Sequence, residues 1–154
     1  MDRHYETAWK QLTSEGAPFS WSEIEVSGIK TRVYDAAPTN LMSIWESSLL
    51  HSDKDYLVYE EERVTYEEAH EKVKLLAAQL DHMGVRHGDR VALAMRNYPE
   101  WVLAYWAIAS LGAVVVGMNA WWTAPELEYA VVDCGAKVII CDDERLERTS
   151  SFLE

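Results

Sequence analysis

The sequence predicts an α/β fold: a partial, doubly wound parallel sheet with helices on both faces, preceded by an irregular N-terminal arm. Short apolar runs at residues 90–95, 113–116 and 137–141 alternate with segments whose apolar residues recur at helical spacing. Two strand–helix–strand units in succession require right-handed crossovers and a parallel sheet covered by helices. The earlier part lacks this alternation, so we divide the chain into an arm, residues 1–55, and an α/β subdomain, residues 56–154.

The arm is expected to contain short local elements. Residues 5–12 have the spacing of a short helix, and residues 24–34 indicate two extended runs about Gly28. After a proline, Thr39 is expected to cap a further helix over residues 41–49, whose apolar side chains share one face.

The α/β subdomain is expected to open with a hairpin and its clearest helix. Residues 56–66 read as two antiparallel strands joined by three acidic residues, 60–62. Thr65 and Glu68 have the spacing of a capping box, in which each side chain binds the backbone amide of the other residue. An apolar stripe then runs to Met83, and Gly84 supplies a left-handed stop.

The strand–helix alternation follows. Asn97 is expected to cap a helix that is apolar almost all round and therefore largely buried, and Thr123 with Glu126 repeats the capping-box spacing before a helix that Gly135 ends. After the last strand, either Asp142 or Asp143 can begin another helix.

Composition and charge exclude several classes of function. The chain has 154 residues with a formal net charge of −12, which would repel a phosphate backbone, so nucleic acid is not an expected partner. No window approaches the roughly 18 apolar residues of a membrane span, and the N-terminus lacks a secretory pattern. We expect a cytoplasmic protein in which Cys134 and Cys141 are reduced, buried thiols.

Motifs that bind phosphate or metal are absent from the sequence. Neither the glycine-rich dinucleotide fingerprint nor a Walker-type loop occurs, and the turn at residues 96–100 offers no glycine for a phosphate to approach. Glu67 and His70 have a spacing found in carboxylate-bridged metal sites, but such a site needs a second copy. We therefore expect a solvated surface pair there, and expect all five histidines to be solvated: His4, His51, His70, His82 and His87.

Two adjacent tryptophans form the most conspicuous local feature. Trp121 and Trp122, next to Asn119, could line an acyl or aromatic pocket. Because consecutive side chains rarely point the same way, at most one ring is expected to face any pocket, and packing of the loop is favoured over contact with a ligand.

A series of short motifs follows in order from about residue 56 to residue 143. Its residues are 64–68, Leu80, Gly84, Val85, 88–92, Asn97, Pro99, Glu100, 111–114, Asn119, Thr123, Glu126, Leu127 and 135–137. Their order and spacing resemble the adenylate-forming enzymes, which include acyl-CoA synthetases, firefly luciferase and peptide-synthetase adenylation domains. The tryptophan pair is most similar to the branch of fatty-acyl-CoA and related carboxylate–CoA ligases. One departure is that Gly117 and Met118 stand where members of the family commonly have proline and leucine.

The resemblance implies the N-terminal part of an enzyme that joins a carboxylic acid to coenzyme A through an acyl-adenylate, using ATP and Mg. The family's phosphate-binding loop, its ATP-binding motifs, its hinge and its late lysine lie further along, so this fragment is not expected to be active. The resemblance assigns no catalytic, cofactor-binding or metal-binding residue in this chain. The implied partners are the rest of the synthetase and, through the arm, a second copy in a homodimer.

Two other functions remain open from the sequence. The chain can be a free-standing, non-catalytic interaction module derived from the same fold, which would use an exposed sheet edge or the aromatic loop to bind its partner. It can also be a small nucleotide-binding domain, which would bind ATP or coenzyme A measurably.

Overall fold

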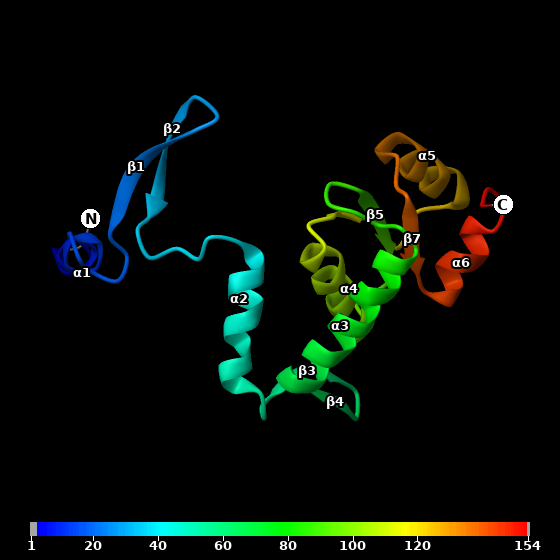
Figure 1. Ribbon diagram of the computed structural model, residues 1–154, viewed down its shortest axis with the longest axis horizontal. Helices are drawn as coiled ribbons and strands as arrows, with labels where there is room; N and C mark the ends of the chain where they lie inside the picture. Colours follow the sequence, from blue (N-terminus) through cyan, green and yellow to red (C-terminus); the bar gives the residue numbers. More distant parts are fainter. Residues whose placement is uncertain (1–2, 154) are drawn as a thin grey trace. The chain divides into compact units, whose positions relative to one another are not determined.

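The computed structural model describes residues 3–153, and the contacts between residues divide the chain into two compact units (Figure 1). The first unit ends at Ser43 and the second begins at Ile44. The domain boundary expected at residue 55 stays a prediction, because it concerns the organisation of the protein to which these units belong.

The first unit contains a helix and a β-hairpin. Helix α1 spans Arg3–Thr13, and strands β1 (Trp21–Val26) and β2 (Ile29–Tyr34) pair antiparallel. Ser27 and Gly28 join them with φ values of 52° and 81°, the combination that the tight turns of two-residue hairpins require. The expected helix and the two extended runs about Gly28 are confirmed, although the first strand begins earlier than expected.

Helix α2 spans Leu41–Ser47 and continues as a 3₁₀ turn over Ser48–His51. The helix was expected at this position, but the expected cap is wrong. The side-chain oxygen of Asn40 accepts a hydrogen bond from the Ser43 amide at 2.9 Å, whereas the Thr39 hydroxyl lies 3.5 Å from the Ser43 hydroxyl. Asn40 caps the helix because it immediately precedes the first helical residue, the position from which a short side chain reaches the third amide.

The second unit opens with the predicted hairpin and helix. Strands β3 (Asp55–Tyr59) and β4 (Glu62–Thr65) pair antiparallel, so the third acidic residue of the expected turn belongs to β4. Helix α3 spans Tyr66–His82 and begins with the predicted capping box: the Thr65 amide donates to Glu68 Oε2 at 2.8 Å, and the Glu68 amide donates to Thr65 Oγ1 at 3.2 Å.

Three parallel strands form the central sheet, in the order β6-β5-β7. They are β5 (Arg90–Ala94), β6 (Val114–Gly117) and β7 (Val138–Cys141), and the helices between and after them are α4 (Pro99–Ser110), α5 (Ala124–Cys134) and α6 (Asp143–Thr149). The α/β class and the parallel sheet are thus confirmed.

Helices cover both faces of this sheet, as the sequence predicted (Figure 1). Leu93 and Met95 pack with Ala104 of α4 and with α3, while Ala92 and Ala94 pack with Leu127 of α5. The alternation follows from the two-residue period of a strand, which turns successive side chains to opposite faces.

The helix boundaries on this sheet agree with the expected signals, with one exception. Asn97 does not cap α4, because the capping position is Tyr98, whose side chain makes no capping hydrogen bond, and Pro99 takes the first turn. The capping box of Thr123 and Glu126 is present at α5. Asp142, rather than its neighbour, caps α6 by accepting from the Arg145 amide.

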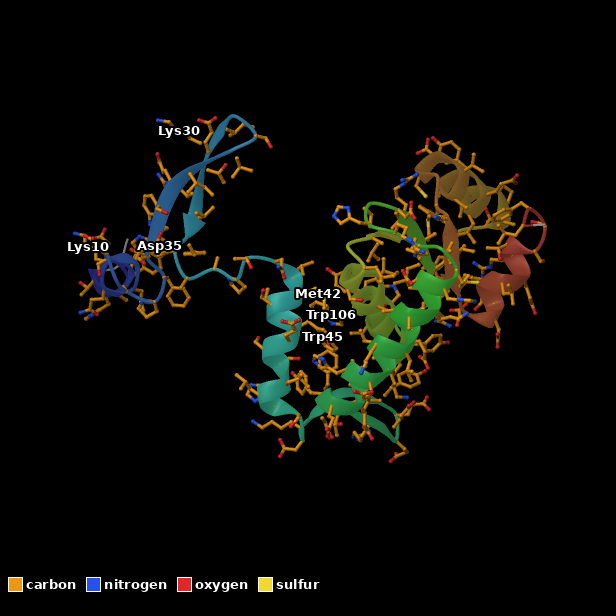
Figure 2. All side chains as sticks on the ribbon, viewed as in Figure 1. Lys10, Lys30, Asp35, Met42, Trp45 and Trp106 are labelled. Carbon is orange, nitrogen blue, oxygen red and sulfur yellow. The ribbon has the colours of Figure 1, made fainter. Side chains whose placement is uncertain are left out.

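An aromatic cluster anchors the start of the second unit. The buried Trp45 stacks on His70, with ring centroids 3.9 Å apart, and on Trp106 at 4.8 Å (Figure 2). His70 Nε2 lies 3.0 Å from Ser48 Oγ, and burial lowers the pKa of the imidazole against the opposing hydrogen bond with the Trp45 carbonyl. The prediction of a solvated His70 is therefore wrong, because helical spacing cannot show that a distant tryptophan covers that face.

Within residues 3–153, no helix is both long enough and apolar enough to cross a bilayer.

Candidate functional site

The carboxyl edge of the parallel sheet is the candidate functional site. The helix after β5 lies on one face of the sheet and the helix after β6 lies on the other. Adjacent strands whose connections leave to opposite faces open a crevice between their carboxyl ends, which is where ligands bind in open α/β sheets. A largely polar hollow of about 420 Å³ lies there, lined by Tyr59, Arg96, Asn97, Tyr98, Ala120 and Trp121.

Arg96 and Trp121 face each other across this crevice. The Arg96 guanidinium carbon lies 4.7 Å from the centroid of the Trp121 ring, which is cation–π geometry. The indole is 69% exposed, and its loop is held by a 2.9 Å hydrogen bond from the Trp121 amide to Asn119 Oδ1. An arginine on an exposed indole presents its remaining donors to the crevice.

The two adjacent tryptophans have different environments. Trp122 is half-buried and packs against the cluster that contains Met118 and Leu127. The favoured interpretation, loop packing, is confirmed for Trp122 and is wrong for Trp121. Trp121 lines the crevice and Trp122 lines a separate hollow between β6 and α5, so each ring faces a different hollow and neither hollow is lined by both.

A buried arginine holds the loop after β6 in place. The Arg145 side chain is 1% exposed, and its Nε donates to the Ala120 carbonyl at 2.7 Å. Its Nη1 forms ion pairs with Asp142 at 3.2 Å and with Glu144 at 2.9 Å. Since these carboxylates begin α6, Arg145 links the carboxyl end of β7 to the loop that carries Trp121.

The carboxylate of Asp142 connects the turns after β5 and β7. It accepts hydrogen bonds from the backbone amides of Arg96 and Arg145, each at 3.0 Å. Burial raises the pKa of Asp142, but these two amides and the Arg145 guanidinium outweigh burial, so the pKa lies below its ordinary value. Asp142 is therefore ionised near neutral pH and fixes the position of Arg96.

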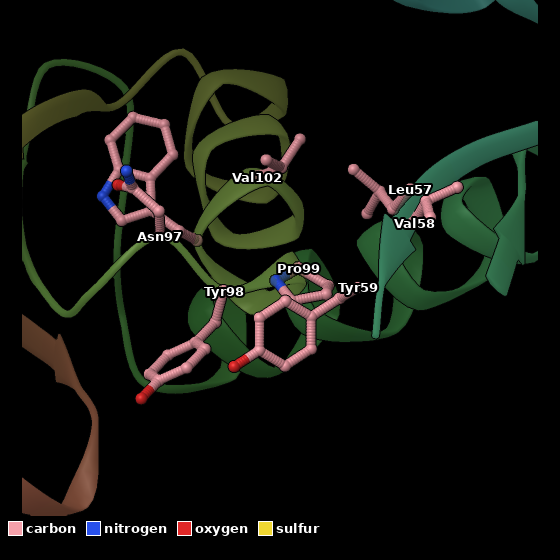
Figure 3. A pocket seen from close by; sticks show the side chains of 8 residues that line it. Leu57, Val58, Tyr59, Asn97, Tyr98, Pro99 and Val102 are labelled. Atoms are coloured by element: carbon pink, nitrogen blue, oxygen red, sulfur yellow. The ribbon is translucent and has the colours of Figure 1, made fainter. Parts of the chain in front are cut away.

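A second hollow continues from the crevice along the hairpin. It has a volume of about 210 Å³ and lies between the hairpin and the start of α4 (Figure 3). Its lining is mainly apolar and includes Leu57, Val58 and Val102. Tyr59 and Tyr98, whose rings meet edge to face at 5.7 Å, border both hollows, so the two hollows are neighbours, one mainly apolar and one lined by Arg96.

A third hollow lies on the open side of β6. It has a volume of about 560 Å³ and is bounded by β6 and α5, with Trp122, Tyr129 and Cys134 among its lining residues. β6 is an edge strand, so the backbone groups on this side pair with no other strand within residues 3–153.

The groups usual in catalysis are sparse in the part of the chain that the structure describes. Residues 3–153 contain no group of three or more His, Cys, Asp or Glu side chains placed to hold a metal. Cys134 and Cys141 are free and half-buried, and burial raises the pKa of the Cys141 thiol. The absence of catalytic, cofactor-binding and metal-binding residues stays a prediction. The arginine and the exposed indole of the crevice are suited to bind an anionic or planar group.

Sequence reasoning singled out Trp121 but missed Arg96 and Arg145. Arg96 directly follows the apolar run predicted as the first parallel strand. A residue at that position lies at the carboxyl edge of a parallel sheet, so the predicted strand could have placed Arg96 there. Arg145 follows three acidic residues, and nothing in that pattern shows that its side chain is buried.

Comparison with known proteins identifies the family that shares this architecture. The family described as AMP-binding enzymes matches residues 44–153, which is most of the chain. The chain belongs to the AMP-binding enzyme family. The resemblance noted from the sequence is thereby confirmed.

Members of the AMP-binding family similar to this chain are much longer than it. The acetyl-coenzyme A synthetase of Cupriavidus taiwanensis is 35% identical over 143 residues, which cover 89% of this chain and 20% of that protein. The crystal structure of the anthranilate CoA ligase AuaEII in complex with anthranoyl-AMP matches with a TM-score of 0.70 and 32% identity, over 73% of this chain and 22% of that one.

A third relative is an isolated domain. The inhibitor-bound N-terminal domain of FACL13 from Mycobacterium tuberculosis matches with a TM-score of 0.67 and 28% identity, over 73% of this chain and 29% of that domain. The chain therefore spans about a fifth of the full-length relatives named above and less than a third of this domain.

Proposed function

We propose that this chain is the N-terminal part of an AMP-forming acid–CoA ligase. In that reaction a carboxylate attacks the α-phosphorus of Mg-ATP, releasing pyrophosphate, and the thiol of coenzyme A then displaces AMP from the acyl-adenylate. The observation that carries the proposal is the family match over residues 44–153. The structural likeness to a CoA ligase that holds an acyl-AMP supports it.

The role of this part is to build and position the first sheet of the AMP-binding domain. Adenylation needs Mg and an array of cationic and amide donors to neutralise the phosphate charge in the transition state. The chain carries a net charge of −12 and no phosphate-binding loop in its sequence. We therefore expect the 154 residues alone to be inactive, with ATP, Mg and coenzyme A bound by the whole enzyme.

Finer features of the parent enzyme are also proposed. The tryptophan pair favours the branch that activates fatty and related carboxylic acids, and we place the enzyme in the cytoplasm. The first unit is proposed as the contact of a homodimer, because its hairpin exposes the apolar side chains of Ile24, Val26 and Ile29.

The test is to read the native gene past codon 154 and to compare two purified proteins, the 154-residue chain and the longer product. Acid-dependent exchange of labelled pyrophosphate into ATP is measured with a panel of short, long and aromatic carboxylic acids. We expect exchange only with the longer protein. A reading frame that ends at codon 154 would contradict the proposal and favour the free-standing interaction module.

The nucleotide-binding alternative is tested on the 154-residue chain itself. Isothermal titration with ATP and with coenzyme A is expected to give no heat of binding at millimolar ligand. Saturable heat with either nucleotide would show that this part binds the cofactor by itself, contrary to the proposed scaffolding role.

A further inference from the structure

Helix α6 contacts both walls of the crevice at the carboxyl edge of the sheet. One wall is the turn after β5, which carries Arg96, and the other is the loop after β6, which carries Trp121. Asp142, the cap of α6, accepts a hydrogen bond from the Arg96 amide at 3.0 Å. Arg145 and Arg148, both on α6, reach the loop with their guanidinium groups. The two walls therefore share one support, a helix that follows a third strand, β7.

The two arginines of α6 bind backbone carbonyls on either side of Trp121. Arg145 Nε donates to the Ala120 carbonyl at 2.7 Å, and Arg148 Nη1 donates to the Trp122 carbonyl at 2.8 Å. Arg148 Nη1 also lies 3.3 Å from the Ala120 carbonyl oxygen. Peptide units are planar, so two held carbonyls leave only the few dihedral angles between them to vary. The arginines thereby restrict the backbone of Trp121.

Carboxylates of the same helix hold both guanidinium groups in place. Arg145 forms ion pairs with Asp142 at 3.2 Å and with Glu144 at 2.9 Å, and the other oxygen of Glu144 binds Arg148. The side chain of Arg145 is 1% exposed and that of Arg148 is 28% exposed. Hydrogen bonds between charged groups are short and directional, so these four side chains form one network with fixed geometry.

Trp121 needs this support because its ring is not packed into the core. The indole is 69% exposed, and the Arg96 guanidinium carbon lies 4.7 Å from its centroid. Trp122, by contrast, packs against the cluster that contains Met118 and Leu127. A stack of an exposed guanidinium on an exposed indole is weak by itself. The position of the Trp121 ring therefore depends on the backbone that α6 holds.

The composition of the network favours a role in the geometry of the crevice. An apolar side chain at a buried position often stabilises a fold as well as a buried ion pair does, because an arginine loses its hydration there. What the guanidinium adds is direction, since its planar fork binds a carbonyl and a carboxylate at fixed angles. At Arg145 the carbonyl is that of Ala120, next to Trp121. The network thus places the Trp121 loop relative to α6.

Arg96 is left with donors that face the crevice. Within residues 3–153 it takes part in no ion pair, and its guanidinium contacts the Trp121 ring. A guanidinium binds carboxylates and phosphates with parallel hydrogen bonds. The crevice therefore suits a substrate that carries an anionic group.

We propose that Arg145 and Arg148 are positioning residues, which hold the Trp121 indole against Arg96 so that the crevice binds an anionic substrate of the enzyme. They act through the loop and not on the substrate itself. The statement about a substrate rests on the proposed function, whereas the statement about Trp121 concerns the folded chain alone. The inference adds which side chains set the shape of the crevice.

The first experiment reads the position of Trp121 by fluorine NMR, in the whole protein that the native gene encodes. Tryptophan is replaced by 5-fluorotryptophan, and Trp121→Phe assigns the resonance. Arg148→Met is expected to move this resonance toward its value in Arg96→Met, where the stack is absent. Arg148→Lys, which keeps a cationic donor, should move it less. Arg86→Met removes an arginine that is 62% exposed and pairs with Asp81, and this matched control should leave the resonance unchanged.

The second experiment measures kcat and KM of the same protein for ATP, the carboxylic acid and coenzyme A. Arg96→Met is expected to raise the KM of one substrate about ten-fold, the factor that corresponds to roughly 1.4 kcal/mol of lost binding. Arg148→Met should raise the KM of that same substrate, with a smaller change in kcat, and Arg148→Lys should recover part of the loss. A role in stability alone would lower the amount of active protein without selecting one KM.

Several results would overturn the inference. They are a Trp121 resonance that Arg148→Met leaves in place, KM values that Arg96→Met does not change, and an Arg148→Met protein in which a different KM rises. Circular dichroism checks that each variant is folded, and Arg148→Lys carries the same comparison if Arg148→Met is not. If the protein lacks acid-dependent pyrophosphate exchange, the proposed function fails, and the fluorine resonance still decides the positioning role. If exchange is present, the proposed function stands whether or not this inference does.

Discussion

The hairpin of the first unit and the parallel sheet of the second unit differ in sequence pattern and in burial: the hairpin strands mix polar and apolar residues, whereas the sheet strands are short, nearly continuous apolar runs. In the hairpin, every residue of β1 and β2 is exposed except the half-buried Val33. In the central strand β5, every residue after Arg90 is buried, with relative exposures of 0%. Both elements have strand-forming sequences, but only one has both faces covered.

Different interactions support the two elements. The hairpin follows from its turn and from cross-strand pairs, such as Glu23 with Arg32 at 3.9 Å, an exposed ion pair of small value. Its other face carries the aliphatic side chains of Ile24, Val26 and Ile29 without a cover inside the first unit. An isolated two-stranded hairpin is marginal in water, whereas the sheet is stabilised by the apolar surface buried on both faces.

Removing an aliphatic side chain should have very different effects in the two regions. Leu93→Ala in β5 should lower the free energy of unfolding by about 2–5 kcal/mol, because it leaves a cavity in a fully buried site. Ile24→Ala in the hairpin, where the side chain is 45% exposed, should change it by less than about 0.5 kcal/mol. Urea denaturation followed by circular dichroism measures both, and equal effects would contradict the contrast.

The second prediction concerns the polar link at the carboxyl edge of the sheet. Arg145→Met should destabilise the second unit by about 2 kcal/mol, because the Ala120 carbonyl and the Asp142 carboxylate lose a buried donor. The partner carboxylates are partly solvated, so the loss is smaller than for a fully buried pair. Arg32→Met in the first unit is the matched control, and a loss as large as that of Arg145→Met would refute the distinction.

The capping box at the start of α5 should contribute to stability by itself. Thr123→Ala should cost about 1 kcal/mol, since it removes a hydroxyl of the capping box at the start of α5, which donates to the Glu126 carboxylate at 2.8 Å. Thr31→Ala on the exposed hairpin serves as the control, because its hydroxyl bonds only to the Ile29 carbonyl at 3.2 Å. Thermal unfolding of the two variants compares them, and a Thr31→Ala variant that melts earlier than Thr123→Ala would contradict the prediction.

The smallest expected effect is a pH dependence. Because the pKa of Asp142 is lower in the folded state than in the unfolded state, its contribution is full above the ordinary aspartate range, about 4, and is lost as the pH falls through the folded value. Asp142→Asn should therefore flatten the fall of the unfolding free energy in acid, measured by urea titrations between pH 6 and the acid limit of folding. An Asp142→Asn variant with the same slope in acid as the unchanged protein would contradict the prediction.

Most of the fold was predictable because its signals are local. The capping boxes of Thr65 and Thr123 and the left-handed stops at Gly84 and Gly135 mark helix ends through bonds within a few residues, and all four are present. The two wrong caps, Thr39 and Asn97, are errors of one position. Thr39 was chosen although its neighbour Asn40 can also cap. Asn97 was chosen although Pro99 starts α4 without a capping side chain.

The candidate site was less predictable, since it depends on contacts between distant segments. Trp121 was noticed for its residue type, but only the structure places it over Arg96 at 4.7 Å. His70 likewise stacks on Trp45, which is distant in the sequence. Arg145 is buried, which is unusual for an arginine. Hydropathy patterns rank side chains by type and therefore miss polar groups that are buried with partners.

The order of the elements, the parallel sheet with covered faces and the family of the chain could all be inferred from the amino-acid sequence. These follow from periodicity, capping and motif order, which are properties of short stretches of chain. Only the tertiary structure decided that Arg96, Trp121, Asp142 and Arg145 meet at one edge of the sheet, and that Trp122 turns inward while its neighbour stays exposed. The physical reason is that crossover connections bring the carboxyl ends of separate strands together, and the contacts made there depend on all three strands at once.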